Sequence, residues 1–172
     1  MKLLLLIVLV GVGIYIGSTT SEIKRVTKMR MNNTLVDKWL GIMEQLEISN
    51  CEVVLAQAIL ETGNFKSKIL RENRNHFGMK YNKRGHCMGT RYGHCYYQSD
   101  IDSYIDYKEW QDAMLDGRVL TNAEYLLELN CMTRRWNKRY AEDPLYTDKL
   151  KILITKIQAC RSRDTLEIGT AK

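Results

Sequence analysis

The segment from Ser49 to Gly63 constrains the fold most strongly, because its residues have the pattern of one complete helix. Ser49 and Glu52 have the spacing of a capping box, and the apolar residues that follow recur at helical intervals. Gly63 stands where a left-handed C-terminal cap is expected. The pattern predicts an apolar helix that carries Glu61 in its last turn.

The position of Glu61 favours the neutral form of its carboxyl group. The negative end of the helix macrodipole opposes ionisation there, and the apolar neighbours Leu60 and Phe65 withdraw the carboxyl from water. A carboxyl that tends to stay protonated is suited to donate a proton as a general acid. An ordinary solvated glutamate can occupy the same helix position, so position alone does not assign this role.

The remaining pattern predicts more helices and one hairpin. A Gly- and Tyr-rich stretch over residues 80–98 has the character of a short β-hairpin. Two short helical segments are expected before and after Asn130. Capping residues mark three further helix starts, at Asn33 or Thr34, at Ser99 or Asp100, and at Asp143 followed by Pro144. The predicted fold class is therefore α+β and mainly α.

Composition indicates one domain and an anionic partner. With 172 residues, of which 45% are hydrophobic, the chain can bury one core, and we expect a single domain over residues 22–172 and a monomer. The net charge of +6 suits a cell wall, a membrane surface or nucleic acid. The basic residues are scattered, so no nucleic-acid function is predicted.

The N-terminal residues 1–21 have the features of an export segment. Lys2 precedes an apolar run over residues 3–16, and small polar residues follow as far as Ser21, as in a secretory signal. No Ala-x-Ala cleavage site is present, and residues 3–21 approach the length of about 20 residues that spans a bilayer. A signal peptide and a retained membrane tether both remain open. Either one predicts an exported protein of the periplasm, the cell envelope or the extracellular space.

Five cysteines leave at least one that forms no disulfide within the chain. Cys87 and Cys95 flank the expected hairpin turn, so we predict a disulfide between them. Free thiols are one alternative. A metal site with His86 and His94 is another, because Gly-His-Cys occurs twice, but the spacing of zinc fingers is missing and we predict no metal.

Four segments stand out in order along the chain. They are Ala56-Gln-Ala-Ile-Leu-Glu-Thr-Gly63, Asn75-His-Phe-Gly78, Ser103-Tyr-Ile-Asp-Tyr-Lys-Glu-Trp-Gln111 and Tyr140-Ala-Glu-Asp-Pro-Leu-Tyr146. Through these segments the chain, from about residue 53 to residue 154, resembles the glucosaminidase family of bacterial cell-wall hydrolases, glycoside hydrolase family 73. Arg74 and His76 depart from the family, which more often has asparagine and an aliphatic residue there.

The resemblance implies a lysozyme-like fold, in which a helical lobe and a small β-hairpin lobe bound a sugar-binding groove. It implies that Glu61 is the catalytic glutamate and Tyr140 the active-site tyrosine. Many members have a second carboxylate in the β-lobe, but residues 81–98 contain no Asp or Glu here. Asp100 and Asp102 lie just beyond and are candidates, although a helix-start role is the simpler interpretation of both.

Aromatic and amide side chains are candidates for binding sugar rings. Tyr92, Tyr96 and Tyr97 in the hairpin region are suited to stack on pyranose faces or to bind hydroxyl groups. Packing within the hairpin is the competing interpretation of each. By analogy with the family turn, Asn75 and Phe77 are expected to shape the floor of the groove.

These observations predict an exported endo-acting N-acetylglucosaminidase. It would hydrolyse the β-1,4 bond after N-acetylglucosamine in peptidoglycan, with Glu61 as general acid and no cofactor. Two alternatives stay open. One is a lytic transglycosylase, and the other is a non-catalytic module that binds the cell wall.

Overall fold

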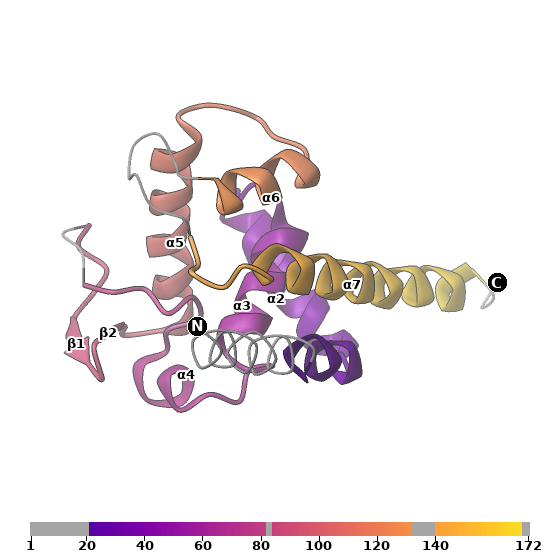
Figure 1. Ribbon diagram of the computed structural model, residues 1–172, viewed down its shortest axis with the longest axis horizontal. Coiled ribbons are helices and arrows are strands. Elements are labelled where there is room, and N and C mark those ends of the chain that lie inside the picture. The colour runs from indigo at the N-terminus through magenta and orange to yellow at the C-terminus, as the bar shows by residue number, and fades with distance from the viewer. Residues whose placement is uncertain (1–20, 82–83, 132–139, 170–172) are drawn as a thin grey trace, which may run out of the picture. The chain divides into compact units, whose positions relative to one another are not determined.

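The computed structural model describes residues 21–81, 84–131 and 140–169 (Figure 1). The chain divides into two compact units, Met1–Arg30 and Met31–Lys172. Residues 21–28 of the first unit are helical. Within the described ranges, none of the helices is both long and apolar enough to cross a membrane. The predicted signal or tether lies outside these ranges except for Ser21.

The second unit is built mainly from helices and contains one small antiparallel sheet, which confirms the predicted α+β class (Figure 1). Its elements are α2 (Asn33–Gln45), α3 (Cys51–Glu61), α4 (Lys68–Asn73), β1 (Gly89–Arg91), β2 (His94–Tyr96), α5 (Asp100–Leu115), α6 (Asn122–Asn130) and α7 (Tyr146–Gly169). Figure 1 shows the hairpin on the side away from α7.

Helix α3 is the centre of this unit. It packs against α2, α6 and α7, and every residue over 53–59 is buried. A helix that is apolar on all sides requires such a position, because no face of it is suited to water. The helix ends as predicted: Thr62 is the C-cap, and Gly63 follows with a left-handed φ of +57°. Glu61 is therefore the last residue of a helix whose central residues are all buried.

The start of α3 differs from the predicted capping box. Asn50 is the N-cap, in a left-handed conformation and without a side-chain cap hydrogen bond. The Ser49 backbone instead exchanges two hydrogen bonds with the Gln111 amide of α5, at 2.9 and 2.8 Å. The Asn50 amide donates to the Leu120 carbonyl oxygen. Tertiary hydrogen bonds to distant residues replace the local motif.

Helix α5 begins with a capping box between Ser99 and Asp102, in agreement with the predicted start at Ser99. Two other predicted starts are shifted, since Asn32 caps α2 and α7 begins at Tyr146. Before α7, Asp143 accepts a hydrogen bond from the Leu145 backbone within a turn. The helical segment predicted after Asn130 falls on residues 132–139, outside the described ranges.

The hairpin pairs Gly89 with Tyr96 and Arg91 with His94. Its two-residue turn, Tyr92-Gly93, has φ angles of +55° and +75°, as a tight turn between twisted strands requires. A disulfide joins Cys87 to Cys95. The side-chain amides of Asn73 and Asn75 both donate to the Cys95 carbonyl oxygen, at 3.2 and 3.0 Å. These bonds hold the hairpin against the chain that follows α3 and α4.

Candidate active site

Glu61 combines surface exposure with a carboxyl group that protein atoms surround. The residue is exposed at the end of α3. The surrounding protein still displaces water from its carboxyl, and this desolvation raises the pKa of Glu61. A hydrogen bond from Tyr146 and the charge of His94 oppose the rise without cancelling it. Glu61 is thus accessible and biased toward its protonated form.

Tyr146, the first residue of α7, is the side chain that holds Glu61. Its hydroxyl donates to Glu61 Oε1 at 3.0 Å, and only 5% of the residue is exposed. Gln57 Nε2 donates to the same hydroxyl at 3.4 Å, which directs the Tyr146 proton toward Glu61. Tyr107 in turn donates to Gln57 Oε1 at 2.6 Å. A chain of buried polar groups therefore fixes the orientation of the Glu61 carboxyl.

Tyr140, the tyrosine singled out from the sequence, packs against Tyr146 and makes no hydrogen bond to Glu61. Its ring packs against Trp110 and Tyr146, with centroid distances of 5.2 and 5.6 Å. Its hydroxyl is buried and has no hydrogen-bond partner among the described residues. Burial, and next the charge of Glu61, raise the pKa of Tyr140. The tyrosine in direct contact with Glu61 is thus the last residue of the Tyr140-to-Tyr146 motif, and sequence reasoning missed it.

The Phe-Gly turn lies on the other side of the Glu61 carboxyl. Gly78 has a left-handed φ of +64°, and a Cβ atom at this position would lie 3.8 Å from Glu61 Oε2. The Gly78 carbonyl accepts a hydrogen bond from His94 Nδ1 at 3.0 Å. Phe77 is buried, and its ring packs 4.1 Å from that of Tyr107, measured between centroids. Phe77 thus supports the turn from within the core.

Asn75 shapes this turn through all of its amide groups. Its Oδ1 accepts from the backbone of Phe77 and of Met79, at 3.2 and 3.0 Å. Its Nδ2 donates to the carbonyl oxygens of Met79 and Cys95. Only 1% of Asn75 is exposed. Its amide therefore positions the backbone between Glu61 and the hairpin, and its polar atoms are already occupied by protein.

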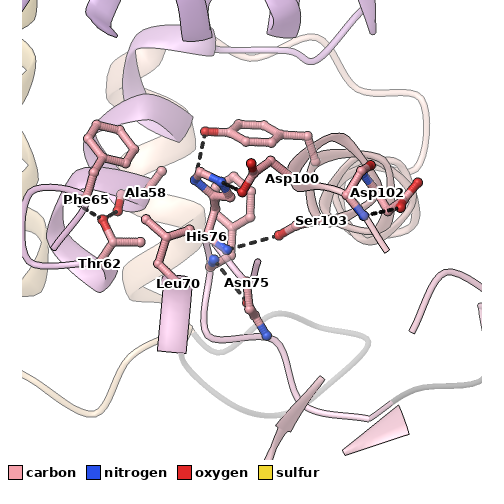
Figure 2. A network of polar contacts seen from close by, with 12 residues as sticks. Ala58, Thr62, Phe65, Leu70, Asn75, His76, Asp100, Asp102 and Ser103 are labelled. Carbon is pink, nitrogen blue, oxygen red and sulfur yellow. Dashed lines mark hydrogen bonds and ion pairs between the residues drawn. The ribbon is translucent and has the colours of Figure 1, made fainter. Parts of the chain in front are cut away.

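Asp100 and Asp102 are bound to other partners, and neither contacts Glu61 among the described residues. Asp102 Oδ2 accepts from the Ser99 backbone at 2.8 Å, as a capping residue. Asp100 Oδ1 pairs with His76 Nε2 at 2.9 Å, and Figure 2 shows His76 joined to both Asp100 and Ser103 by hydrogen bonds. The hydrogen bond from His76 holds the pKa of Asp100 below its usual range. Asp102 thus caps α5, and Asp100 is paired with His76.

A pocket of about 280 Å³ adjoins the His76–Asp100 pair. Its lining includes Trp39 and Phe65, whose rings stack with centroids 6.2 Å apart, and the guanidinium-bearing Arg74. His76 is 1% exposed, and burial lowers the pKa of its imidazole. Aromatic rings, the guanidinium groups of Arg71 and Arg74, and the carboxylate of Asp100 all line this small pocket.

The three candidate sugar-stacking tyrosines separate into surface and core residues. Tyr92 is 52% exposed and its hydroxyl donates to Glu72. Tyr96 is half-buried against Gly89, with Arg91 over its ring. Tyr97 is buried and donates to Asp106 at 2.6 Å.

The hairpin cysteines and histidines are engaged separately. The disulfide removes both thiolates from the metal alternative. His86 pairs with Glu109 at 2.8 Å, whereas His94 binds the Gly78 carbonyl. Over residues 21–81, 84–131 and 140–169, no group of three or more His, Cys, Asp or Glu side chains is placed to hold a metal ion.

A helical domain with a small β-hairpin, and a desolvated yet accessible glutamate at the end of its central helix, match the architecture of a lysozyme-like glycoside hydrolase. The chain belongs to the Glucosaminidase family, described as mannosyl-glycoprotein endo-beta-N-acetylglucosaminidase, whose sequence model matches residues 37–159. This confirms the resemblance and extends it to include most of α2. Comparison with curated proteins and with solved structures gave no match.

Membership of this family makes the protein a glycoside hydrolase of the endo-β-N-acetylglucosaminidase type. The family supports hydrolysis of peptidoglycan glycan in general, and such a substrate places its action at the cell envelope or outside the cell.

Proposed function

We propose that the protein hydrolyses the β-1,4 bond after N-acetylglucosamine in peptidoglycan, with Glu61 as general acid. The observation that carries this proposal is the Glu61 carboxyl itself. It is accessible at the end of a buried helix, its pKa is raised by desolvation, and its Oε1 is held by Tyr146 at 3.0 Å.

The arrangement suits protonation of a departing sugar oxygen. Because Tyr146 donates to Oε1, the carboxyl proton belongs on Oε2, which faces Gly78. Transfer of that proton to the glycosidic oxygen leaves a carboxylate, and the Tyr146 hydrogen bond stabilises this charged form. The small Gly78 leaves space beside Oε2 for a substrate. Tyr146 thus stabilises the Glu61 carboxylate that remains after proton transfer.

The remaining candidates have different roles in this proposal. Tyr92 is the exposed candidate platform for sugar rings, and Tyr96 is a weaker one because Arg91 lies over its ring, while Asn75, Phe77 and Tyr97 maintain the shape of the site from within. Tyr140 supports Tyr146 through ring packing. Asp100 and Asp102, with their partners in His76 and Ser99, are weaker candidates for a second carboxylate. No cofactor is required for glycoside hydrolysis by acid catalysis.

The proposal includes export and a single catalytic domain over residues 22–172. Residues 1–21 would serve as a signal peptide or, through residues 3–21, as a membrane tether. The net charge of +6 favours approach to an anionic cell wall. We propose that the protein acts as a monomer on glycan strands.

The decisive experiment measures reducing sugar released from purified peptidoglycan by the wild type and by Glu61→Gln. The amide has nearly the same shape and cannot donate the proton, so release should fall by about 100-fold or more. Glu44→Gln, an exposed site on α2, is the matched control and should stay at the wild-type rate.

Three outcomes separate the alternatives. Products that contain an added water support hydrolysis, whereas anhydro products, seen by mass spectrometry, identify a lytic transglycosylase. A wild-type protein that pellets with cell walls but releases no sugar is a binding module. An active Glu61→Gln variant would exclude Glu61 as the acid.

A further inference from the structure

Proton donation by Glu61 leaves half of the reaction unassigned, since the attacking water must also lose a proton. We propose that His94 is the general base, whose Nε2 takes that proton. This inference rests on the proposed hydrolysis and goes beyond it, because it names a histidine of the hairpin as the second catalytic residue.

Position is the first observation that supports His94. Gly78 lies close to both groups: its carbonyl oxygen accepts a hydrogen bond from His94 Nδ1 at 3.0 Å, and a Cβ atom placed on it would lie 3.8 Å from Glu61 Oε2. The His94 imidazole and the Glu61 carboxyl therefore both lie close to Gly78. His94 is the first residue of β2, and the hairpin that carries it is fixed by the disulfide at Cys95.

The hydrogen bond to Gly78 also sets the tautomer of His94. A carbonyl oxygen can only accept, so Nδ1 carries the hydrogen, and in the neutral ring the lone pair lies on Nε2. His94 Nε2 has no hydrogen-bond partner among the described residues, and the side chain is half-buried. The ring is thus oriented by protein at one nitrogen and open at the nitrogen that a base must use.

Charge balance between the two residues favours the reaction. The step requires an imidazole whose Nε2 lone pair is available and a protonated carboxyl, and it produces an imidazolium and a carboxylate. The charge of His94 lowers the pKa of Glu61, whereas desolvation raises it. Opposite charges that develop together in a partly desolvated site stabilise each other. Each group therefore aids ionisation of the other as the protons move.

The step is balanced in atoms and charge. The bond between the anomeric carbon and the glycosidic oxygen breaks, and its electron pair stays on that oxygen, which takes the Glu61 proton. The water oxygen bonds to the anomeric carbon, and its proton passes to His94 Nε2. Solvent then returns a proton to Glu61 and removes one from His94. Direct attack by water from the opposite face gives inversion, so the first product is the α anomer.

The hairpin region supplies its own control in His86. Gly85-His86-Cys87 repeats the tripeptide Gly93-His94-Cys95, but His86 Nε2 is paired with Glu109 at 2.8 Å. The two histidines have the same sequence neighbours and different partners. Substitution of His86 therefore tests for general damage to the hairpin region.

The test compares the full chain as wild type, His94→Gln, His94→Ala and His86→Gln on purified peptidoglycan. Glutamine at position 94 keeps a polar amide of similar length in place of the ring but cannot act as a base. We expect kcat to fall by about 100-fold in both His94 variants with little change in KM. We expect added imidazole to restore part of the activity of His94→Ala, and His86→Gln to remain near wild type.

The stereochemistry of the wild-type reaction is the second readout, followed by proton NMR of the first product. An α anomer supports the proposal, and a β anomer overturns it. Either His94 variant within about twofold of wild type overturns it, as does a loss that imidazole leaves unrestored in His94→Ala. A wild type that releases no reducing sugar would overturn the proposed hydrolysis as well, whereas an active wild type with an active His94→Gln would overturn only the role of His94.

Discussion

The Tyr146 hydroxyl donates a hydrogen bond of 3.0 Å to Oε1 of Glu61. This contact joins the first residue of α7 to the last residue of α3, across 85 positions of sequence. It lowers the pKa of Glu61 against the larger effect of desolvation, which raises it. The balance between the two determines the pH range in which Glu61 can donate a proton.

Tyr146→Phe should move the alkaline limb of the pH–activity profile to higher pH. Without the hydrogen bond, only the charge of His94 opposes desolvation, so the pKa of Glu61 rises further and the carboxyl stays protonated to higher pH. The loss of stabilisation of the carboxylate should also lower kcat, by about tenfold. The measurement is kcat/KM against pH.

Tyr107→Phe is the matched control for this prediction. It removes buried hydrogen bonds to Gln57 and Tyr125, at 2.6 and 2.9 Å, without touching Glu61. The control should lose stability and keep the wild-type alkaline limb. A Tyr146→Phe limb that stays in place, or moves to lower pH, would contradict the assigned contact.

Glu61→Gln should stabilise the folded protein above the ordinary pKa of glutamate. Because folding raises the pKa of Glu61, its carboxylate is less favourable in the folded chain than in the unfolded chain. This cost is absent at low pH and appears as pH rises through the unfolded and then the folded pKa. The residue is partly exposed, so solvent screening limits the gain to below about 1 kcal/mol.

Thermal unfolding at pH 4 and pH 8 checks this prediction. The variant should unfold about 2 °C higher than wild type at pH 8, with a smaller difference at pH 4. The exposed-site variant Glu44→Gln should show no such pH dependence. A larger gain at pH 4 than at pH 8 would reverse the assigned direction of the pKa.

Local sequence patterns predicted the parts of the fold that depend on local energetics. The apolar run before Glu61 required burial on all sides, and Gly63 marked the end of the helix. Ser99 and Asp102 formed their capping box because both partners lie within one turn. At Ser49 the same local logic was wrong, since the Gln111 amide from α5 binds its backbone. The spacing of residues along the sequence cannot predict hydrogen bonds between residues that folding brings together from distant positions.

The same distinction applies to the candidate site. The resemblance located the segment from Tyr140 to Tyr146, but only the packing of α7 on α3 shows which tyrosine reaches Glu61. The placement of Gly78 close to both Glu61 and His94 also depends on tertiary structure. One sequence signal did exist: a hairpin region without acids that still carries two histidines, His86 and His94, between which the sequence does not choose.

His76→Leu should weaken the acid sensitivity of folding. Burial lowers the pKa of His76, although its bond to Asp100 acts in the opposite direction. The neutral ring is therefore favoured by folding, and stability is lost as pH falls below the unfolded value of about 6.5. Leucine cannot be protonated, so this loss, of the order of 1 kcal/mol, should disappear.

Chemical denaturation at pH 7.5 and pH 5 measures the effect. The difference in unfolding free energy between the two pH values should be smaller in His76→Leu than in wild type. His86→Leu removes a half-buried histidine from the surface and is the control. A variant with the same acid sensitivity as wild type would show that His76 does not titrate on unfolding.

The Cys87–Cys95 disulfide should stabilise the hairpin lobe by about 2 kcal/mol, because it closes a short loop in the unfolded chain. The double variant Cys87→Ser with Cys95→Ser should lose that amount in denaturant unfolding. Cys131→Ser, at an exposed thiol, should lose nothing measurable. Equal stability of the double variant and wild type, both under oxidising conditions, would show that the disulfide does not form in solution.

Asp106→Asn should cost more stability than any of these changes. Asp106 is fully buried on α5, where Arg84 Nε donates to Oδ1 at 2.7 Å and the Tyr97 hydroxyl donates to Oδ2 at 2.6 Å. An asparagine leaves the guanidinium without its carboxylate and presents amide hydrogens where an acceptor is needed. Breaking a buried ion pair in this way costs about 3 kcal/mol.

The location of this loss is also predictable. Arg84 and Tyr97 flank the disulfide-bonded hairpin, so the loss of their bonds to Asp106 should appear as faster proteolysis within residues 84–98 before the helices unfold. Asp112→Asn is the control, since Asp112 forms an exposed pair with Lys108 on the same helix. It should change stability by less than about 0.5 kcal/mol. Equal losses in the two variants would mean that the buried pair has no greater role in stability than a surface one.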